Sequence, residues 1–110
     1  MRALFVCSRN RMRSPTAETV FAGYEGLETL SAGTETDAVT PVDAELIEWA
    51  EIIFAMENSH RNKLRQRFGK LLDGRRLIVL RIRDDYDYMQ PELIELLKKK
   101  VPPHLPGLLS

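Results

Sequence analysis

Short apolar runs alternate with segments of helical character along the whole chain. Most of these runs have the length and composition of a strand buried inside a parallel sheet. The segments between them carry amphipathic spacing or helix start signals. We therefore predict strands at residues 3–6, 28–31, 52–55 and 77–82, and helices at residues 15–24, 42–50, 58–68 and 91–101.

This alternation predicts an α/β fold with a single open sheet of four parallel strands. Crossover connections between parallel strands share one hand, which places helices on both faces of the sheet. The 110 residues are enough for one hydrophobic core and too few for two, so residues 1–110 are expected to form one domain. Residues 101–107 contain three prolines, cannot continue a helix, and are expected to trail over the surface.

The segment after the first predicted strand holds Cys7, five further residues, then Arg13 and Ser14. Ser14 followed by Pro15 predicts a helix start, with serine as the N-cap and proline at the first helical position. A Ser14 hydroxyl hydrogen-bonded toward the Cys7 sulfur is an equally plausible role and does not exclude the first. Backbone N–H groups in such a strand-to-helix loop point inward, and the helix dipole adds positive charge, so the loop suits a phosphate. The planar fork of Arg13 could bind two phosphoryl oxygens.

The same donors would stabilise the thiolate form of Cys7 and make its sulfur a nucleophile. A lone cysteine at a strand end is more often only a small buried side chain. Its position at the base of an anion-binding loop favours the nucleophile here.

Composition and charge narrow the function classes. Sixteen basic and sixteen acidic residues give no net charge, so neither a nucleic-acid nor a membrane partner is expected. Arg2, Arg9, Arg11 and Arg13 gather near the N-terminus and could attract an anion to one mouth, although Arg9 and Arg11 are equally compatible with ordinary solvated surface. The single cysteine excludes an internal disulfide, and no apolar run approaches a membrane span, so we expect a cytoplasmic protein.

With Cys7, Arg13 and Ser14 at the first strand-to-helix turn, the chain resembles the low-molecular-weight protein tyrosine phosphatase family. Asn10 falls where that family keeps an asparagine in the left-handed conformation, which asparagine tolerates well. Three later segments are also similar to family segments and come in the family's order. They are Ser-Ala-Gly-Thr at 31–34, Met-Glu-Asn-Ser at 56–59, and Ile-Arg-Asp-Asp-Tyr at 82–86. The ordered matches are more specific than the Cys-x5-Arg pattern alone.

The resemblance implies strand order 2-1-3-4 and a phosphomonoester hydrolase, tyrosine phosphatase-like, that forms a phosphocysteine intermediate. The implied substrate is a phosphorylated protein or a small phosphomonoester, and no metal or cofactor is expected. In that mechanism Cys7 is the nucleophile and Arg13 holds the phosphoryl group. The remaining loop residues are expected to bind substrate: Ser8, Arg9, Asn10, Arg11, Met12 and Ser14.

A proton donor for the leaving group is expected among the aspartates that follow the fourth strand, at the same sheet edge as Cys7. Asp84 aligns with the family's acid, and Asp85 is the alternative; solvated turn positions are the competing interpretation. Tyr86 aligns with an aromatic residue that flanks the substrate ring, although packing would explain it too. His60 is expected on an exposed helix face, and no role is expected for His104.

The chain also departs from the family pattern. Met12 stands where the family has a second cysteine, Arg9 where glycine is common, and Asp87 in place of a second aromatic residue. The stretch between Thr34 and Met56 is shorter by about a dozen residues, roughly one helix. A shallower and more polar mouth is expected, so phosphomonoester chemistry is better supported than phosphotyrosine specificity.

Two other function classes remain open. A cysteine phosphoryl carrier also places cysteine after the first strand, but it would need neither a hydrolytic acid nor Arg13. A non-catalytic phosphate- or phosphoprotein-binding module is favoured if Asp84 and Asp85 both point away from the loop. A related arsenate reductase needs further cysteines, and the chain has only Cys7.

Overall fold

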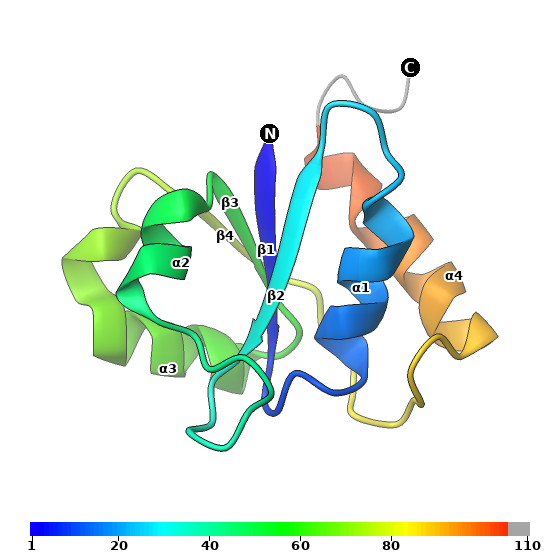
Figure 1. Ribbon diagram of the computed structural model, residues 1–110, viewed down its shortest axis with the longest axis horizontal. Coiled ribbons are helices and arrows are strands. Elements are labelled where there is room, and N and C mark those ends of the chain that lie inside the picture. The colour runs from blue at the N-terminus through cyan, green and yellow to red at the C-terminus, as the bar shows by residue number, and fades with distance from the viewer. Residues whose placement is uncertain (106–110) are drawn as a thin grey trace.

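A computed structural model describes residues 1–105 and has one sheet between two layers of helices (Figure 1). All strand pairs are parallel and the order is β2-β1-β3-β4, which confirms the predicted fold class and strand order. The strands are β1 (Arg2–Cys7), β2 (Glu28–Gly33), β3 (Ile52–Ala55) and β4 (Arg76–Val79). The helices are α1 (Arg13–Phe21), α2 (Ala44–Trp49), α3 (Asn58–Phe68) and α4 (Pro91–Lys100), with short 3-10 helices η1 (Gly69–Leu72) and η2 (Pro102–His104).

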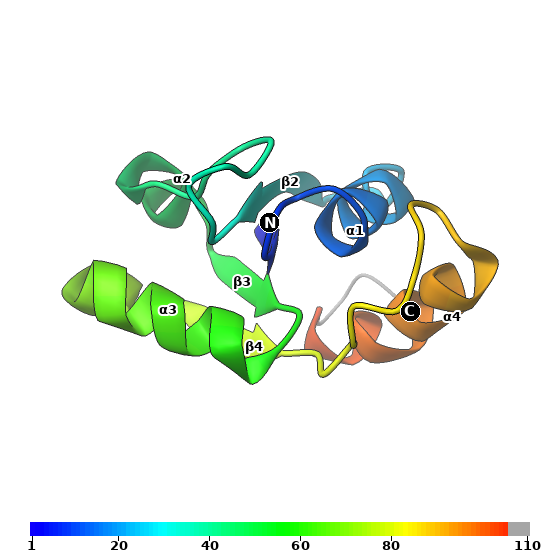
Figure 2. The same cartoon turned by 90° about the horizontal axis from the view of Figure 1, so that it is seen from below.

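The core has two parts, one on each face of the sheet. Because side chains alternate along a strand, Ala3 and Phe5 of β1 pack with α1 and α4 on one face. Leu4 and Val6 pack with α2 and α3 on the other. Figure 2 shows the two helix pairs on opposite sides of the strands. The central strand β1 is therefore apolar at nearly every position, as its sequence predicts.

Two of the boundaries that differ from the prediction bear on the site, the start of α1 and the end of β4. Helix α1 begins at Arg13, with Met12 as its N-cap residue, so the predicted N-cap role of Ser14 is wrong. The Ser14 hydroxyl lies inside the first turn and contacts the Cys7 sulfur instead. Strand β4 ends at Val79 rather than at residue 82, because Arg81 takes the left-handed conformation with φ 57°.

The segment after α4 does not trail over the surface. Val101, Pro102 and Leu105 are buried, and Val101 and Leu105 join the core between α1 and α4. The prediction of a loose tail is therefore wrong for residues 101–105, and Pro106 and Gly107 lie outside the described residues. Apolar side chains that follow a helix can cover a sheet face without periodic spacing, and this signal is easily missed.

The fold brings the carboxyl ends of the strands to one edge, at the lower end of Figure 1. Cys7 is level with Gly33 at the end of β2, and Val6 is level with Ala55 at the end of β3. The segments that follow β1, β2, β3 and β4 therefore meet there, at the usual ligand position in open α/β sheets. Within residues 1–105, no helix is long and apolar enough to cross a membrane.

Candidate active site

The loop between β1 and α1 is held open by its neighbour, the segment after β2. Backbone N–H groups of that segment donate to three successive loop carbonyls: Thr34 to Cys7 (2.9 Å), Glu35 to Ser8 (3.0 Å) and Val39 to Arg9 (3.1 Å). A trans peptide directs its carbonyl and the next N–H to opposite sides. With these carbonyls turned outward, the N–H groups of Ser8, Arg9 and Asn10 face inward and form a concave set of donors.

The Cys7 sulfur lies at the base of this loop. Its side chain is almost buried, at 3% exposure, and the remaining exposed part faces a cavity of about 480 Å³. The sulfur lies 2.9 Å from Ser14 Oγ and 3.3 Å from the Asn10 backbone nitrogen. Both groups can donate to a thiolate, so the arrangement suits a nucleophile rather than a passive core residue.

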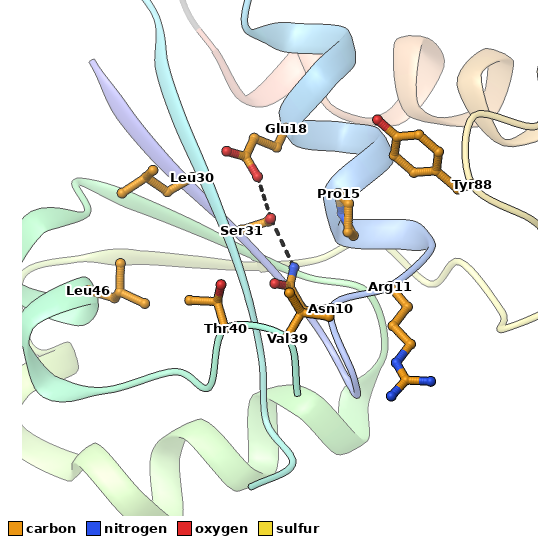
Figure 3. A pocket seen from close by; sticks show the side chains of 10 residues that line it. All are labelled: Asn10, Arg11, Pro15, Glu18, Leu30, Ser31, Val39, Thr40, Leu46 and Tyr88. Carbon is orange, nitrogen blue, oxygen red and sulfur yellow. Dashed lines mark hydrogen bonds between the residues drawn. The ribbon is translucent and has the colours of Figure 1, made fainter. Parts of the chain in front are cut away.

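Asn10 shapes the loop from behind. Its φ of 58° confirms the expected left-handed conformation. Its Nδ2 donates to Ser14 Oγ and to Ser31 Oγ, each at 2.9 Å, and Ser31 donates to Glu18. Figure 3 shows Glu18, Ser31 and Asn10 along the wall of a second cavity of about 730 Å³, on the other side of the loop. The smaller cavity is the candidate active site because it contains the sulfur.

Arg13 is nearly buried, at 2% exposure, and its guanidinium is held in place. One terminal nitrogen donates to Glu57 Oε1 at 2.5 Å and to the Ile82 carbonyl at 2.8 Å. Its Nε lies 3.7 Å from Asp84 Oδ1. Anchoring one corner of the fork leaves its other donors pre-positioned for phosphoryl oxygens.

The two candidate acids take different positions. Asp84 lines the cavity with Cys7 and Arg13. Asp85 pairs instead with Arg83 at 3.4 Å, and both of these side chains are exposed. Tyr86 is half-buried against the core between α1 and α4, so its predicted place beside a substrate ring stays a prediction.

The rim of the cavity is formed by Arg9, Arg11 and Met12, all exposed, together with Glu35. The Arg9 side chain also lies 4.0 Å from Asp37. Sequence reasoning missed Glu35, which directly follows the family-like segment at 31–34 and pairs with Lys63 at 3.2 Å. Charged side chains of both signs therefore surround the entrance.

His60 is buried, at 1% exposure, so the prediction of an exposed residue is wrong. Its Nε2 lies 2.9 Å from Ser8 Oγ, and its Nδ1 accepts from the Glu57 backbone N–H at 3.0 Å. The pKa of His60 is lowered from 6.5 to about 4, mainly by burial and next by the positive charge of Arg13, with Lys63 acting in the same direction and Glu57 and Asp84 opposing it. The sequence signal was the spacing of Glu57 and His60, which form a reciprocal cap at the start of α3.

Metal binding is not indicated by the described side chains. Across residues 1–105, no group of three or more His, Cys, Asp or Glu residues is placed to hold a metal ion. Charge on a bound anion would be balanced by Arg13 and by backbone N–H groups.

Comparisons with known proteins agree with this geometry. No family model matches the chain, and no curated protein matches it. Among solved structures, YwlE arginine phosphatase, as a C7S mutant with a phosphorylated active site serine, is 25% identical, with a TM-score of 0.74 and coverage of 97% of each chain.

Two further structures are similar over nearly the whole chain. A YwlE mutant from Bacillus subtilis is 27% identical, covers 96% of this chain and 98% of that chain, and has a TM-score of 0.73. SP-PTP, a low molecular weight protein tyrosine phosphatase from Streptococcus pyogenes, is 18% identical, covers 99% and 93%, and has a TM-score of 0.77. The chain therefore has the fold of the low molecular weight protein tyrosine phosphatases over nearly its whole length, and the loop from Cys7 to Ser14 lies at the first strand-to-helix turn of that fold.

Proposed function

We propose that this protein is a cysteine-dependent phosphatase that hydrolyses phosphomonoesters through a phosphocysteine intermediate. One observation carries the proposal: the Cys7 sulfur, the Arg13 guanidinium and the Asp84 carboxyl line the same cavity. A nucleophile, an electrostatic clamp and a proton donor are the three groups that this reaction needs. The 110 residues would act as one low-molecular-weight phosphatase-like domain.

In the first step the Cys7 thiolate attacks phosphorus, and the bond from phosphorus to the leaving oxygen breaks. Arg13 and the inward N–H groups hold the three equatorial oxygens as negative charge builds on them. Asp84 gives its proton to the departing oxygen. A phosphate dianion beside Asp84 would favour the protonated carboxyl that this step needs, because like charges repel.

In the second step water attacks the phosphocysteine. Asp84, now a carboxylate, takes a proton from that water, the sulfur–phosphorus bond breaks, and inorganic phosphate leaves. Cys7 departs as a thiolate beside Ser14 Oγ and the Asn10 N–H, at 2.9 and 3.3 Å. These two contacts lower the energy of the leaving group.

A phosphorylated protein or a small phosphomonoester is the proposed substrate, and phosphotyrosine is the first candidate. Phosphoarginine is the second, because similar structures are those of arginine phosphatases. Two features of the cavity support phosphoarginine as a candidate substrate. Glu35 and Asp84 could accept hydrogen bonds from its guanidinium, and none of the described side chains that line the cavity is aromatic. The same mechanism would then break a phosphorus–nitrogen bond.

The position of Asp84 disfavours the other function classes. A cysteine phosphoryl carrier would keep its phosphoryl group until an acceptor arrived, and a binding module would never form a phosphocysteine. Asp84 at the cavity can activate a water molecule that attacks such an intermediate. No nucleic acid or membrane partner is proposed, and the proposed location is the cytoplasm, where a lone catalytic thiol stays reduced.

The test is turnover of an aryl phosphate by the purified protein. Cys7→Ser should abolish hydrolysis, and circular dichroism of that variant should match the wild type. Rapid acid quenching of the wild type with labelled substrate should trap one phosphoryl group on the chain. Equal turnover by Cys7→Ser would refute the mechanism, and a stable phosphocysteine without phosphate release would identify a carrier. Parallel assays with phosphotyrosine and phosphoarginine peptides decide the substrate class.

A further inference from the structure

The first turn of α3 holds both ends of the loop that carries Cys7. Glu57 and His60 cap the helix reciprocally: the Glu57 N–H donates to His60 Nδ1, and the Glu57 carboxylate accepts from the His60 N–H. The same two side chains also reach the loop. Glu57 binds Arg13 at its far end, and His60 lies 2.9 Å from the Ser8 hydroxyl at its near end.

The capping contact fixes which ring nitrogen of His60 carries the proton. Because Nδ1 accepts a backbone N–H, a neutral ring must carry its hydrogen on Nε2. That hydrogen points at Ser8 Oγ, so the serine oxygen accepts this bond. Burial of the ring at 1% exposure keeps it neutral.

The Ser8 hydroxyl proton is then free for another acceptor. A hydroxyl has one hydrogen to donate, and an oxygen that accepts from His60 must direct this hydrogen elsewhere. Within residues 1–105, Ser8 Oγ contacts no other hydrogen-bonding partner. Ser8 lines the cavity beside Cys7 and Arg13, where a phosphoryl oxygen would be the acceptor.

We propose that His60 is a positioning residue that makes the Ser8 hydroxyl a fixed donor to a phosphoryl oxygen bound in the loop. This inference rests on the proposed function, because the donor matters only if an oxyanion binds beside Cys7. His60 does not line the cavity that contains the Cys7 sulfur, and its ring nitrogens bond to Ser8 and Glu57. It acts through the orientation of Ser8, so the readout must be the affinity for the oxyanion.

The experiment measures inorganic phosphate affinity by isothermal titration calorimetry, which needs no turnover. Ser8→Ala removes the donor and leaves the cap of α3 intact. His60→Asn keeps an acceptor near Nδ1 but is too short to reach Ser8, whereas His60→Gln places an N–H near the position of Nε2. Leu64→Ala is the matched control, because Leu64 is buried in the core cluster with Leu4 and Val6 and does not line the cavity that contains Cys7.

A hydrogen bond to a charged acceptor leads us to expect about tenfold weaker phosphate binding for Ser8→Ala and for His60→Asn. The double variant should bind no more weakly than either single variant, because both changes remove the same donor. His60→Gln should recover most of the affinity, and Leu64→Ala should bind as the wild type does.

Wild-type affinity in Ser8→Ala, or additive losses in the double variant, would overturn the inference. Ser8→Ala remains decisive even if the His60 variants unfold. Failure of the proposed function has a different signature. If the variants change phosphate affinity as expected but the protein never hydrolyses an aryl phosphate, the role of His60 is supported and the proposed phosphatase activity is refuted.

Discussion

Replacing Gly33 with alanine should damage the active site without touching any side chain that performs chemistry. An added Cβ at Gly33 would lie 2.5 Å from the Ser8 carbonyl oxygen and 2.6 Å from Ala38 Cβ. Ordinary contact begins at 3.4 Å, so the new atom would be too close by about 0.9 and 0.8 Å. The first neighbour is backbone and cannot turn aside, so the loop that carries Cys7 must move.

The magnitude follows from that displacement. Overpacking a rigid site costs about 1 to 3 kcal/mol of stability. A reacting group misplaced by about 1 Å can lose roughly 100-fold in rate. We therefore expect kcat/KM toward an aryl phosphate to fall by about two orders of magnitude, with a smaller loss in the denaturant midpoint.

The assay pairs Gly33→Ala with Gly23→Ala, measured by steady-state kinetics and urea unfolding. Gly23 follows α1 in a turn, and no atom lies within 4 Å of an added Cβ there. Gly23→Ala should keep wild-type kinetics and nearly wild-type stability. Wild-type turnover in Gly33→Ala would show that the loop tolerates displacement, and the argument for a rigid donor set would fail.

Three other predictions follow from the described contacts. Asp84→Asn should slow substrates with poor leaving groups far more than good ones, whereas Asp85→Asn should not; the reverse pattern in a leaving-group series would transfer the acid role to Asp85. Arg13→Lys should lower kcat/KM by roughly 100-fold or more, since an ammonium cannot replace the anchored fork, and a loss below tenfold in steady-state kinetics would contradict this. The pKa of His60 is lowered from 6.5 to about 4 in the folded protein, so between these pH values the unfolded chain binds a proton that the folded protein does not. The free energy of unfolding therefore has its full value above pH 6.5 and decreases as the pH falls toward 4. The loss amounts to about 3 kcal/mol, and urea unfolding of His60→Gln should show a flatter pH dependence over that window; an unchanged slope would rule out this origin.

Much of the fold could be predicted because β1 and β3 are apolar at almost every position, which only a doubly covered parallel sheet requires. The bounds of β3 and α3 were predicted correctly. The end of β4 could not be predicted, since Leu80 and Ile82 are buried like strand residues although Arg81 leaves the strand conformation. Their N–H groups still donate to Ala55 and Met56, so the apolar pattern records burial rather than strand geometry.

The candidate site was predictable where one short segment carries it. Cys7 and Arg13 meet at the cavity because a loop of that length closes on itself between a strand and a helix. His60 was missed because it is a polar residue in a polar helix, and its burial depends on the neighbouring loop. Glu35 was missed for a similar reason, since only the packing of the segment after β2 brings it to the entrance.

The outward-tied carbonyls of Cys7, Ser8 and Arg9 have a further consequence. The conformational entropy of ordering this loop is lost during folding, so a bound anion meets a preorganised site. Backbone N–H donors select an anion only by its shape and charge, so vanadate or sulfate should bind there as phosphate does. Discrimination between phosphorylated substrates must therefore come from the charged entrance around Arg9, Arg11 and Glu35. These side chains can change through evolution without disturbing the reacting groups at the base of the loop.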